Sequence, residues 1–193
     1  MIINFLKYDF KNSAASWLDT DICFITVPTP SRNDGSCNVG IVAEVVGELN
    51  KIDYKGIVAL KSTVEPGTTN NLQLKYPNLD ICFVPEFLRE RCATDDFVNN
   101  HDLCVVGTSS DKIFELVKEV HGEYPKKIVK ISEIDAEFCK YFNNSYNATL
   151  VTFAYSFYEL CKKVGADYDI IKDTMINRAV SYTHLTLPTN REV

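Results

Sequence analysis

Five short apolar runs alternate along the chain with amphipathic segments of helical period. The apolar runs are residues 22–27, 57–60, 81–84, 103–106 and 127–131. Because apolar side chains occupy consecutive positions within these runs, the pattern is typical of strands buried on both faces. The amphipathic segments include residues 39–49, 68–75 and 111–120. Strands that alternate with helices of this length predict an α/β fold with a mostly parallel sheet.

One long helix is predicted after the last strand, over residues 133–164. Ser132 and Asp135 are spaced as a weak capping box, and Gly165 suits the position just past a helix end. Such a helix would be about 48 Å long at roughly 1.5 Å per residue, too long for a crossover helix in a small sheet. Apolar residues recur along it near the helical period, at Ile134, Phe138, Phe142, Phe153, Phe157, Leu160 and Val164. We therefore expect another domain or a second subunit to cover it, and a second helix capped by Asp167 to follow over residues 168–177.

Composition narrows the class of protein. Of the 193 residues, 46% are hydrophobic and 24% are charged, as in ordinary soluble globular proteins. A net charge of −6 argues against partners such as nucleic acid or an acidic membrane surface. The seven cysteines are odd in number, form no Cys-x-x-Cys pair and lie mostly in apolar runs, which indicates reduced, buried thiols in a cytoplasmic protein without a metal site. The uncharged stretch 141–158 contains several Asn, Ser and Thr, so we interpret it as a buried helix rather than a membrane span.

Two loops at predicted strand ends carry candidate binding groups. The first, Val27-Pro-Thr-Pro-Ser31, has prolines that leave carbonyls free and hydroxyls on Thr29 and Ser31. It can lie against a flat ligand, or it can simply terminate a strand. The second loop, residues 61–69, places two hydroxyls before a Pro-Gly turn into a helix N-terminus, where a ribose or an attacking water could be held.

The stretch Val84-Pro-Glu-Phe-Leu-Arg-Glu90 puts two carboxylates after a buried strand. If Pro85 opens a helical turn, Glu86 and Glu90 share one face with Arg89 beside them. Acids at the carboxyl end of a buried strand suit proton transfer or ligand contact. The alternative is a solvated first helical turn, in which the acids only complement the helix dipole.

Lys140 and Asn144 are four residues apart on the predicted long helix and hence on one face of it. A lysine next to a site of low dielectric can hydrogen-bond an oxyanion or take part in proton transfer. The alternative for a single lysine is an ordinary surface position, because lysine is almost never fully buried unless paired.

The order and spacing of these clusters resemble the UDP-glucose/GDP-mannose dehydrogenase family, the NAD-dependent nucleotide-sugar 6-dehydrogenases. The resemblance covers residues 19–177. It extends through Lys-Ser-Thr-Val-x-Pro-Gly-Thr-Thr, Pro-Glu-Phe-Leu-Arg-Glu, Glu137-x-x-Lys140-x-x-x-Asn144 and the Cys161-to-Asp167 run. It implies the later part of a Rossmann-like doubly wound parallel sheet (residues 1–131), then a long central helix and a second helix that form a dimerisation segment (residues 132–178).

The same resemblance implies roles for individual residues. The chemistry would be oxidation of a sugar C6 alcohol to a carboxylate with two NAD, through an aldehyde and a cysteine thioester. Thr63 would position water, Glu86 would be the general acid/base for thioester hydrolysis, and Glu90 would lie near the nicotinamide. Lys140 and Asn144 would bind the C6 oxygen and stabilise oxyanions. The NAD site would be lined by Val27, Pro28, Thr29, Pro30, Ser31, Ser62, Thr63 and Val64. The sugar site would be lined by Glu86, Phe87, Leu88, Arg89 and Glu90.

The chain also departs from the family pattern. Residues 1–18 contain no glycine where the phosphate-binding Gly-x-Gly-x-x-Gly loop is expected, and Arg91 replaces the usual glycine after the second Glu. The family's nucleophilic cysteine lies in a Gly-Phe-Gly-Gly-x-Cys motif, so we assign that role to none of the seven cysteines. Residues 179–193 resemble a translated sequencing adapter, with a genuine disordered tail as the alternative. We therefore expect a truncated piece that is inactive by itself and poorly stable.

Several functions stay open at this point. UDP-glucose is the favoured substrate, with GDP-mannose and UDP-N-acetyl-hexosamines as alternatives. A non-catalytic remnant that only dimerises through its long helix is a competing class. Other Rossmann dehydrogenases, of the 3-hydroxyacid or 6-phosphogluconate type, also place a Lys and an Asn four apart on a helix, but they would not explain the Glu86–Glu90 stretch.

Overall fold

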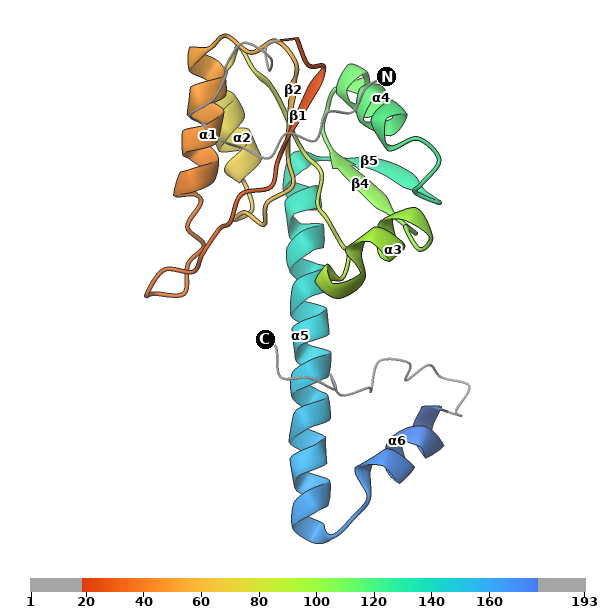
Figure 1. The fold of residues 1–193 in the computed structure, drawn as a ribbon. Coiled ribbons are helices and arrows are strands. Elements are labelled where there is room, and N and C mark those ends of the chain that lie inside the picture. Colours follow the sequence, from red (N-terminus) through yellow and green to blue (C-terminus); the bar gives the residue numbers. More distant parts are fainter. Residues whose placement is uncertain (1–18, 177–193) are drawn as a thin grey trace. The chain divides into compact units, whose positions relative to one another are not determined.

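A computed structural model describes residues 19–176, with the side chain of Glu90 excepted (Figure 1). The chain divides into two compact units, Met1–Lys140 and Tyr141–Val193. The predicted foreign tail lies outside the described residues.

The first unit is built on a five-stranded sheet in the order β1-β2-β3-β4-β5. Its strands are β1 (Ile22–Ile25), β2 (Ile57–Leu60), β3 (Asp80–Phe83), β4 (Cys104–Gly107) and β5 (Ile128–Ile131). The predicted strands are therefore confirmed, each within two residues at its ends. β1, β2 and β3 are parallel, and so are β4 and β5, but β3 pairs with β4 in antiparallel fashion through Phe83 and Gly107.

The sheet is mostly parallel, as predicted, and β4 enters it antiparallel to β3. The segment between β3 and β4 contains only the 3₁₀ turn η2 (Glu90–Cys92) and the short helix α3 (Ala93–Val98). A parallel neighbour requires a crossover from one end of the sheet to the other, whereas an antiparallel neighbour does not. This segment therefore stays at the end where β3 leaves the sheet, which is also where the candidate site lies.

Helices cover both faces of the sheet (Figure 1). Helices α1 (Gly40–Lys51) and α2 (Thr68–Lys75) pack on one face, where Val42 and Leu60 belong to the same hydrophobic core. Helix α4 (Asp111–His121) packs on the other, where Val117 shares a core with Ala59. Side chains of β2 alternate between the two cores. Both faces of β2 are buried, which explains why its sequence is a continuous apolar run.

The long helix α5 (Glu133–Val164) has the predicted bounds and is followed by α6 (Tyr168–Ile176). The Ser132 hydroxyl accepts from the Asp135 N–H at 3.2 Å, and Asp167 accepts from the Asp169 N–H at 2.9 Å, so both predicted caps are confirmed. Gly165 has φ +74°, as expected of a residue just past a helix end.

The first turn of α5 lies directly against the sheet because Gly107 has no side chain. A Cβ built on Gly107 would lie 2.6 Å from the Ala136 Cβ and 3.1 Å from the Glu133 Cα. Ala136 is fully buried in the same core as Leu60. The glycine at the end of β4 therefore sets how closely the helix that carries Lys140 approaches the strands.

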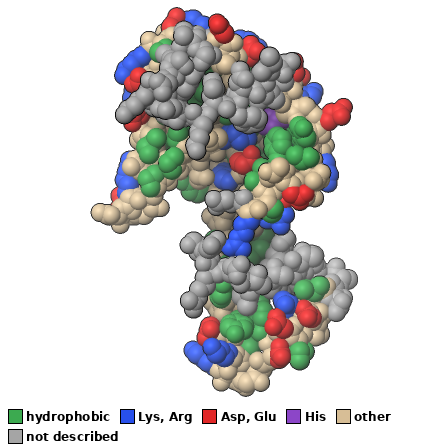
Figure 2. All heavy atoms as spheres, in the orientation of Figure 1, with side chains coloured by type: hydrophobic (Ala, Val, Ile, Leu, Met, Phe, Trp, Pro, Cys, Tyr) green, Lys and Arg blue, Asp and Glu red, His purple; other side chains and the backbone are tan. Residues whose placement is uncertain are grey.

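Beyond Lys140, several large apolar side chains of α5 are exposed, and hydrophobic side chains are visible on the surface of the second unit in Figure 2. The predicted apolar stripe is largely exposed: Phe142 is 75%, Phe153 53% and Leu160 52% exposed. Among residues 141–176, the buried core is a small cluster of Ala154, Cys161 and Tyr168. Between residues 19 and 176, no helix combines the length and the apolar character that crossing a membrane requires.

Candidate active site

The stretch after β3 is extended, so the prediction that Pro85 opens a helical turn is wrong. Residues 84–89 are not helical, and Arg89 has φ −81° and ψ 127°. The Glu86 carbonyl, which a helix would pair with the N–H of Glu90, accepts instead from the Lys140 ammonium. The position of Glu90 on a shared helical face is therefore lost, and its side chain lies outside the described structure.

Glu86 is half-buried and bonded on both carboxylate oxygens. Its Oε2 lies 3.0 Å from the Lys61 Nζ, and its Oε1 accepts from the Phe87 N–H at 3.0 Å. Burial alone would raise the pKa of Glu86, but the Lys61 charge and hydrogen bond, together with the Phe87 N–H, outweigh it and the net pKa is lowered. Glu86 is therefore an ionised hydrogen-bond acceptor at neutral pH, rather than a solvated acid.

Lys140 reaches the same place from the first turns of α5. Its Nζ bonds the Glu86 carbonyl and lies 5.8 Å from the centre of the Phe87 ring. Burial lowers the pKa of Lys140, because the charged ammonium is less well solvated there than in water. A lysine of this kind can donate to a developing oxyanion and is closer to giving up its proton than an exposed one.

Glu137, one turn before Lys140, anchors this part of α5. Its side chain is fully buried and accepts hydrogen bonds from the Gly67 N–H, the Thr69 N–H (2.8 Å) and the Thr69 hydroxyl (2.6 Å). These are donors at the N-terminus of α2, which otherwise lack partners within the helix. Sequence reasoning quoted Glu137 in a motif but gave it no role. The signal that could have found it is a carboxylate three residues before the lysine of a binding pair.

The two proposed cofactor loops are tied to each other. The Ser62 hydroxyl donates to the Val27 carbonyl at 2.6 Å, and the Ser62 N–H donates to the Ile25 carbonyl at 3.1 Å. The stretches 27–31 and 62–64 thus lie at the carboxyl ends of the neighbouring parallel strands β1 and β2, the edge at which open α/β sheets bind nucleotides. Thr63 is half-buried there, whereas the Val64 side chain is in the core and 1% exposed.

Arg89 is held by Asp96 of α3. The Arg89 guanidinium donates to the two Asp96 carboxylate oxygens at 2.9 and 2.6 Å, and the Arg89 N–H adds a third bond at 3.0 Å. The Arg89 hydrogen bonds lower the pKa of Asp96, and the bond to Asp96 raises the pKa of Arg89. This interaction fixes the end of the extended stretch that begins at Glu86.

Not every predicted site residue is brought together. Glu86 and Lys140 meet directly, and Thr63 follows two residues after Lys61. Asn144 is exposed and belongs to the second unit, so its role stays a prediction.

The thiols near this site are unsuited to nucleophilic attack. Burial raises the pKa of Cys82 to about 12 and that of Cys104 to about 11, so both are protonated at neutral pH.

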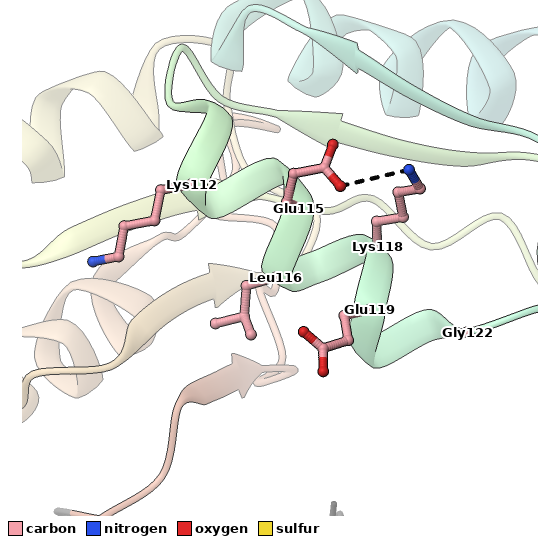
Figure 3. Close-up of a pocket in the computed structure, with 6 residues that line it drawn as sticks. All are labelled: Lys112, Glu115, Leu116, Lys118, Glu119 and Gly122. Atoms are coloured by element: carbon pink, nitrogen blue, oxygen red, sulfur yellow. Dashed lines mark hydrogen bonds and ion pairs between the residues drawn. The ribbon is translucent and has the colours of Figure 1, made fainter.

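A separate surface pocket lies on the outside of α4 (Figure 3). It is lined by Lys112, Glu115, Leu116, Lys118, Glu119 and Gly122. Its Lys118 and Glu115 form an exposed ion pair at 3.5 Å, worth little in free energy. All of its lining residues come from one helix and its end, and it contains none of the motif residues.

Two family models match this chain. Residues 4–124 match the family model described as the NAD binding domain of the UDP-glucose/GDP-mannose dehydrogenase family. Residues 134–186 match the central domain of the same family, a match that runs into the predicted tail.

Individual relatives are similar over most of this chain. A UDP-glucose 6-dehydrogenase of Haloferax volcanii is 35% identical over 169 residues, which are 78% of this chain and 39% of that protein. The crystal structure of a GDP-mannose dehydrogenase ternary complex from Pseudomonas aeruginosa is 28% identical, with TM-score 0.76 over 89% of this chain and 42% of that one. A UDP-glucose dehydrogenase of Pyrobaculum islandicum is 26% identical, with TM-score 0.77 over 86% and 41% of the two chains. The chain thus spans about two-fifths of the length of these relatives.

Proposed function

The chain belongs to the UDP-glucose/GDP-mannose dehydrogenase family, and from that premise we propose that the protein containing it oxidises a nucleotide sugar at C6 to the uronate with NAD. UDP-glucose is the favoured substrate, and GDP-mannose and UDP-N-acetyl-hexosamines are the alternatives. The carrying observation is the direct meeting of Glu86 with Lys140, which are 54 residues apart, at the end of β3.

The arrangement of two loops in this chain suits NAD binding. Residues 27–31 and 62–64 are bonded to one another at the nucleotide-binding edge of the sheet, and their hydroxyls and backbone groups would hold NAD. When bound, NAD accepts the hydride that leaves the sugar C6.

Within this proposal, each polar side chain has a distinct task. Lys140 donates a hydrogen bond to the C6 oxygen as negative charge develops on it, with Asn144 as its partner on the same helix. Glu86, ionised and half-buried, accepts a proton from the water that hydrolyses the thioester, and Thr63 positions that water. Arg89, held by Asp96, keeps the backbone of residues 87–89 extended towards the sugar.

The stretch from Glu86 to Arg89 separates this proposal from the other dehydrogenase types. A Rossmann enzyme of the 3-hydroxyacid type would use the helix lysine without an ionised glutamate at the end of β3. In this chain Lys140 bonds the backbone carbonyl of Glu86, and the ionised carboxylate of the same residue is paired with Lys61. The ionised Glu86 carboxylate supports an enzyme in which a second chemical step follows the first oxidation.

The decisive experiment is steady-state and single-turnover NADH formation by the enzyme expressed from the complete reading frame. We expect activity with one nucleotide sugar when UDP-glucose, GDP-mannose and UDP-N-acetylglucosamine are compared. Glu86→Gln should release NADH in a first turnover and then stall as a thioester, because the water is no longer activated. The matched control is Glu159→Gln, an exposed glutamate of α5. Unimpaired turnover of Glu86→Gln would contradict the role of Glu86.

We further propose that the exposed aromatic face of α5 pairs with a second copy of the chain. Phe142, Tyr146 and Phe153 are 75%, 49% and 53% exposed, and contiguous apolar surface of this kind marks an interaction site. Sedimentation equilibrium should show a dimer that Phe142→Asp dissociates, whereas a monomeric parent would contradict the proposal.

A further inference from the structure

We propose that Lys61 is a positioning residue of the site: its ammonium holds the Glu86 carboxylate ionised and in place, and leaves Lys140 to face the substrate. This inference rests on the proposed function and names a residue that the family resemblance did not assign. Lys61 is the first residue after β2, directly before the hydroxyl pair Ser62 and Thr63.

The Lys61 side chain is fixed at its base and along its length. Its backbone N–H donates to the Ile25 carbonyl at 2.9 Å, which continues the pairing of β1 with β2. Its ammonium lies 5.6 Å from the centre of the Phe24 ring, within the range of a cation–π interaction. Only 15% of the Lys61 side chain is exposed. The ammonium therefore has few positions available, and the one it takes is 3.0 Å from Glu86 Oε2.

Burial distinguishes this ion pair from the surface pairs of the same unit. Lys55 and Asp53 are closer, at 2.6 Å, but their side chains are 70% and 72% exposed. Water screens such a pair, and its contribution is small. The Lys61 and Glu86 side chains are only 15% and 30% exposed, so water solvates and screens their charges less. Each charge is therefore stabilised mainly by the other.

The other groups that face Glu86 do not replace Lys61. Lys140, from α5, bonds the Glu86 carbonyl rather than its carboxylate. His121, at the end of α4, is kept neutral because burial lowers its pKa. Cys104, from β4, is kept protonated for the same reason. His101, which follows α3, also lowers the pKa of Glu86, but by less than the Lys61 charge does.

The arrangement divides the work between two lysines. If Lys61 were absent, Lys140 would be the nearest ammonium for the Glu86 carboxylate, and an electrostatic pull towards it would draw Lys140 away from the C6 oxygen. With Lys61 present, the carboxylate is already paired, and Lys140 can keep its position over Phe87. Lys61 would therefore act on the reaction through Glu86 and Lys140, without touching the substrate.

The test is a titration of the Glu86 carboxyl carbon by ¹³C NMR in the 193-residue chain, with the resonance assigned by its loss in Glu86→Gln. Lys61→Met should shift the Glu86 midpoint upward, because the counter-charge is lost. Lys61→Gln, which keeps a hydrogen-bond donor without the charge, should do the same if the Met variant does not fold. Lys61→Arg should restore the original midpoint, and the control Lys55→Met should leave it unchanged. An unchanged Glu86 midpoint in the charge-removing variants overturns the inference.

A second arm uses the enzyme from the complete reading frame. Lys61→Met should lower kcat by about ten- to a hundredfold, with little change in the KM for the nucleotide sugar, since misplacement of a reacting group is costly at the transition state. The acid limb of its pH–rate profile should move upward, which a merely structural role would not cause. A parent enzyme without activity on any nucleotide sugar would overturn the proposed function, whereas the titration would still decide the assignment of Lys61.

Discussion

Apolar side chains are buried in the first unit but exposed on the part of α5 beyond Lys140. In the first unit, Leu60 is fully buried between helices and strands of its own chain. On α5, Leu160 is 52% exposed, although its apolar spacing predicts burial equally well. The spacing of apolar residues therefore indicates which face of an element is apolar. What covers that face depends on the tertiary or quaternary structure around it.

The difference also holds for the acids. Glu137 is buried and bonded to three donors of α2, so it joins two elements of the first unit. Glu159, further along the same helix, is exposed. Two glutamates on one helix thus have a structural and a solvated role, according to which unit surrounds them.

The largest effect should come from matched leucine truncations. Leu60→Ala should lower the free energy of unfolding by about 3 to 4 kcal/mol, because it removes a fully buried side chain from the interior strand β2 and leaves a cavity. Leu160→Ala, on the exposed face, should change it by less than about 0.5 kcal/mol. Urea denaturation of the 193-residue chain measures both. Equal losses at the two positions would mean that α5 is covered within one chain.

The next effect should come from the two glutamates of α5. Glu137→Ala should cost about 2 to 3 kcal/mol, because the Gly67 and Thr69 donors would be left buried without an acceptor. Glu159→Ala is the control and should be nearly neutral. The same denaturation experiment measures this pair. A neutral Glu137→Ala would show that α5 does not depend on its contact with α2.

A smaller effect should come from filling the close approach at Gly107. Gly107→Ala should cost about 1 to 2 kcal/mol, because its new methyl group would clash with Ala136. In a double-mutant cycle, Ala136→Gly should recover part of the loss, since it removes the clashing atom. Strict additivity of the two changes would contradict the contact between β4 and the start of α5.

The smallest effect should be a loss of stability with acid that is confined to the first unit. Burial lowers the pKa of His121 below its ordinary 6.5, so between those two values the unfolded chain binds a proton that the folded chain does not. Stability should therefore fall as pH falls through this window. The lowered pKa values of Glu86 and Asp96 should extend the loss below their ordinary 4.5 and 3.8.

The pH dependence is measured by urea midpoints between about pH 7 and about pH 5. His121→Leu should flatten the dependence, because the titrating group is gone. A parent chain whose stability rises on acidification through this range would contradict the assigned direction.

The local sequence determined the elements themselves. Apolar runs of four or five residues, the Ser132 and Asp167 caps and Gly165 fixed where strands and helices begin and end, because these signals act over a few neighbouring residues. The resemblance of the motifs to the family also indicated Glu86 and Lys140 as members of one site.

Tertiary structure alone decided how those residues meet. Pro85 suits a helical turn, yet the backbone after it is extended. The Glu86 carbonyl accepts a hydrogen bond from Lys140, and the Arg89 N–H donates one to Asp96. The antiparallel entry of β4, the anchor at Glu137 and the pairing of Lys61 with Glu86 likewise depend on groups far apart in sequence. Local propensities are worth fractions of a kcal/mol per residue, and a few buried hydrogen bonds between distant segments outweigh them.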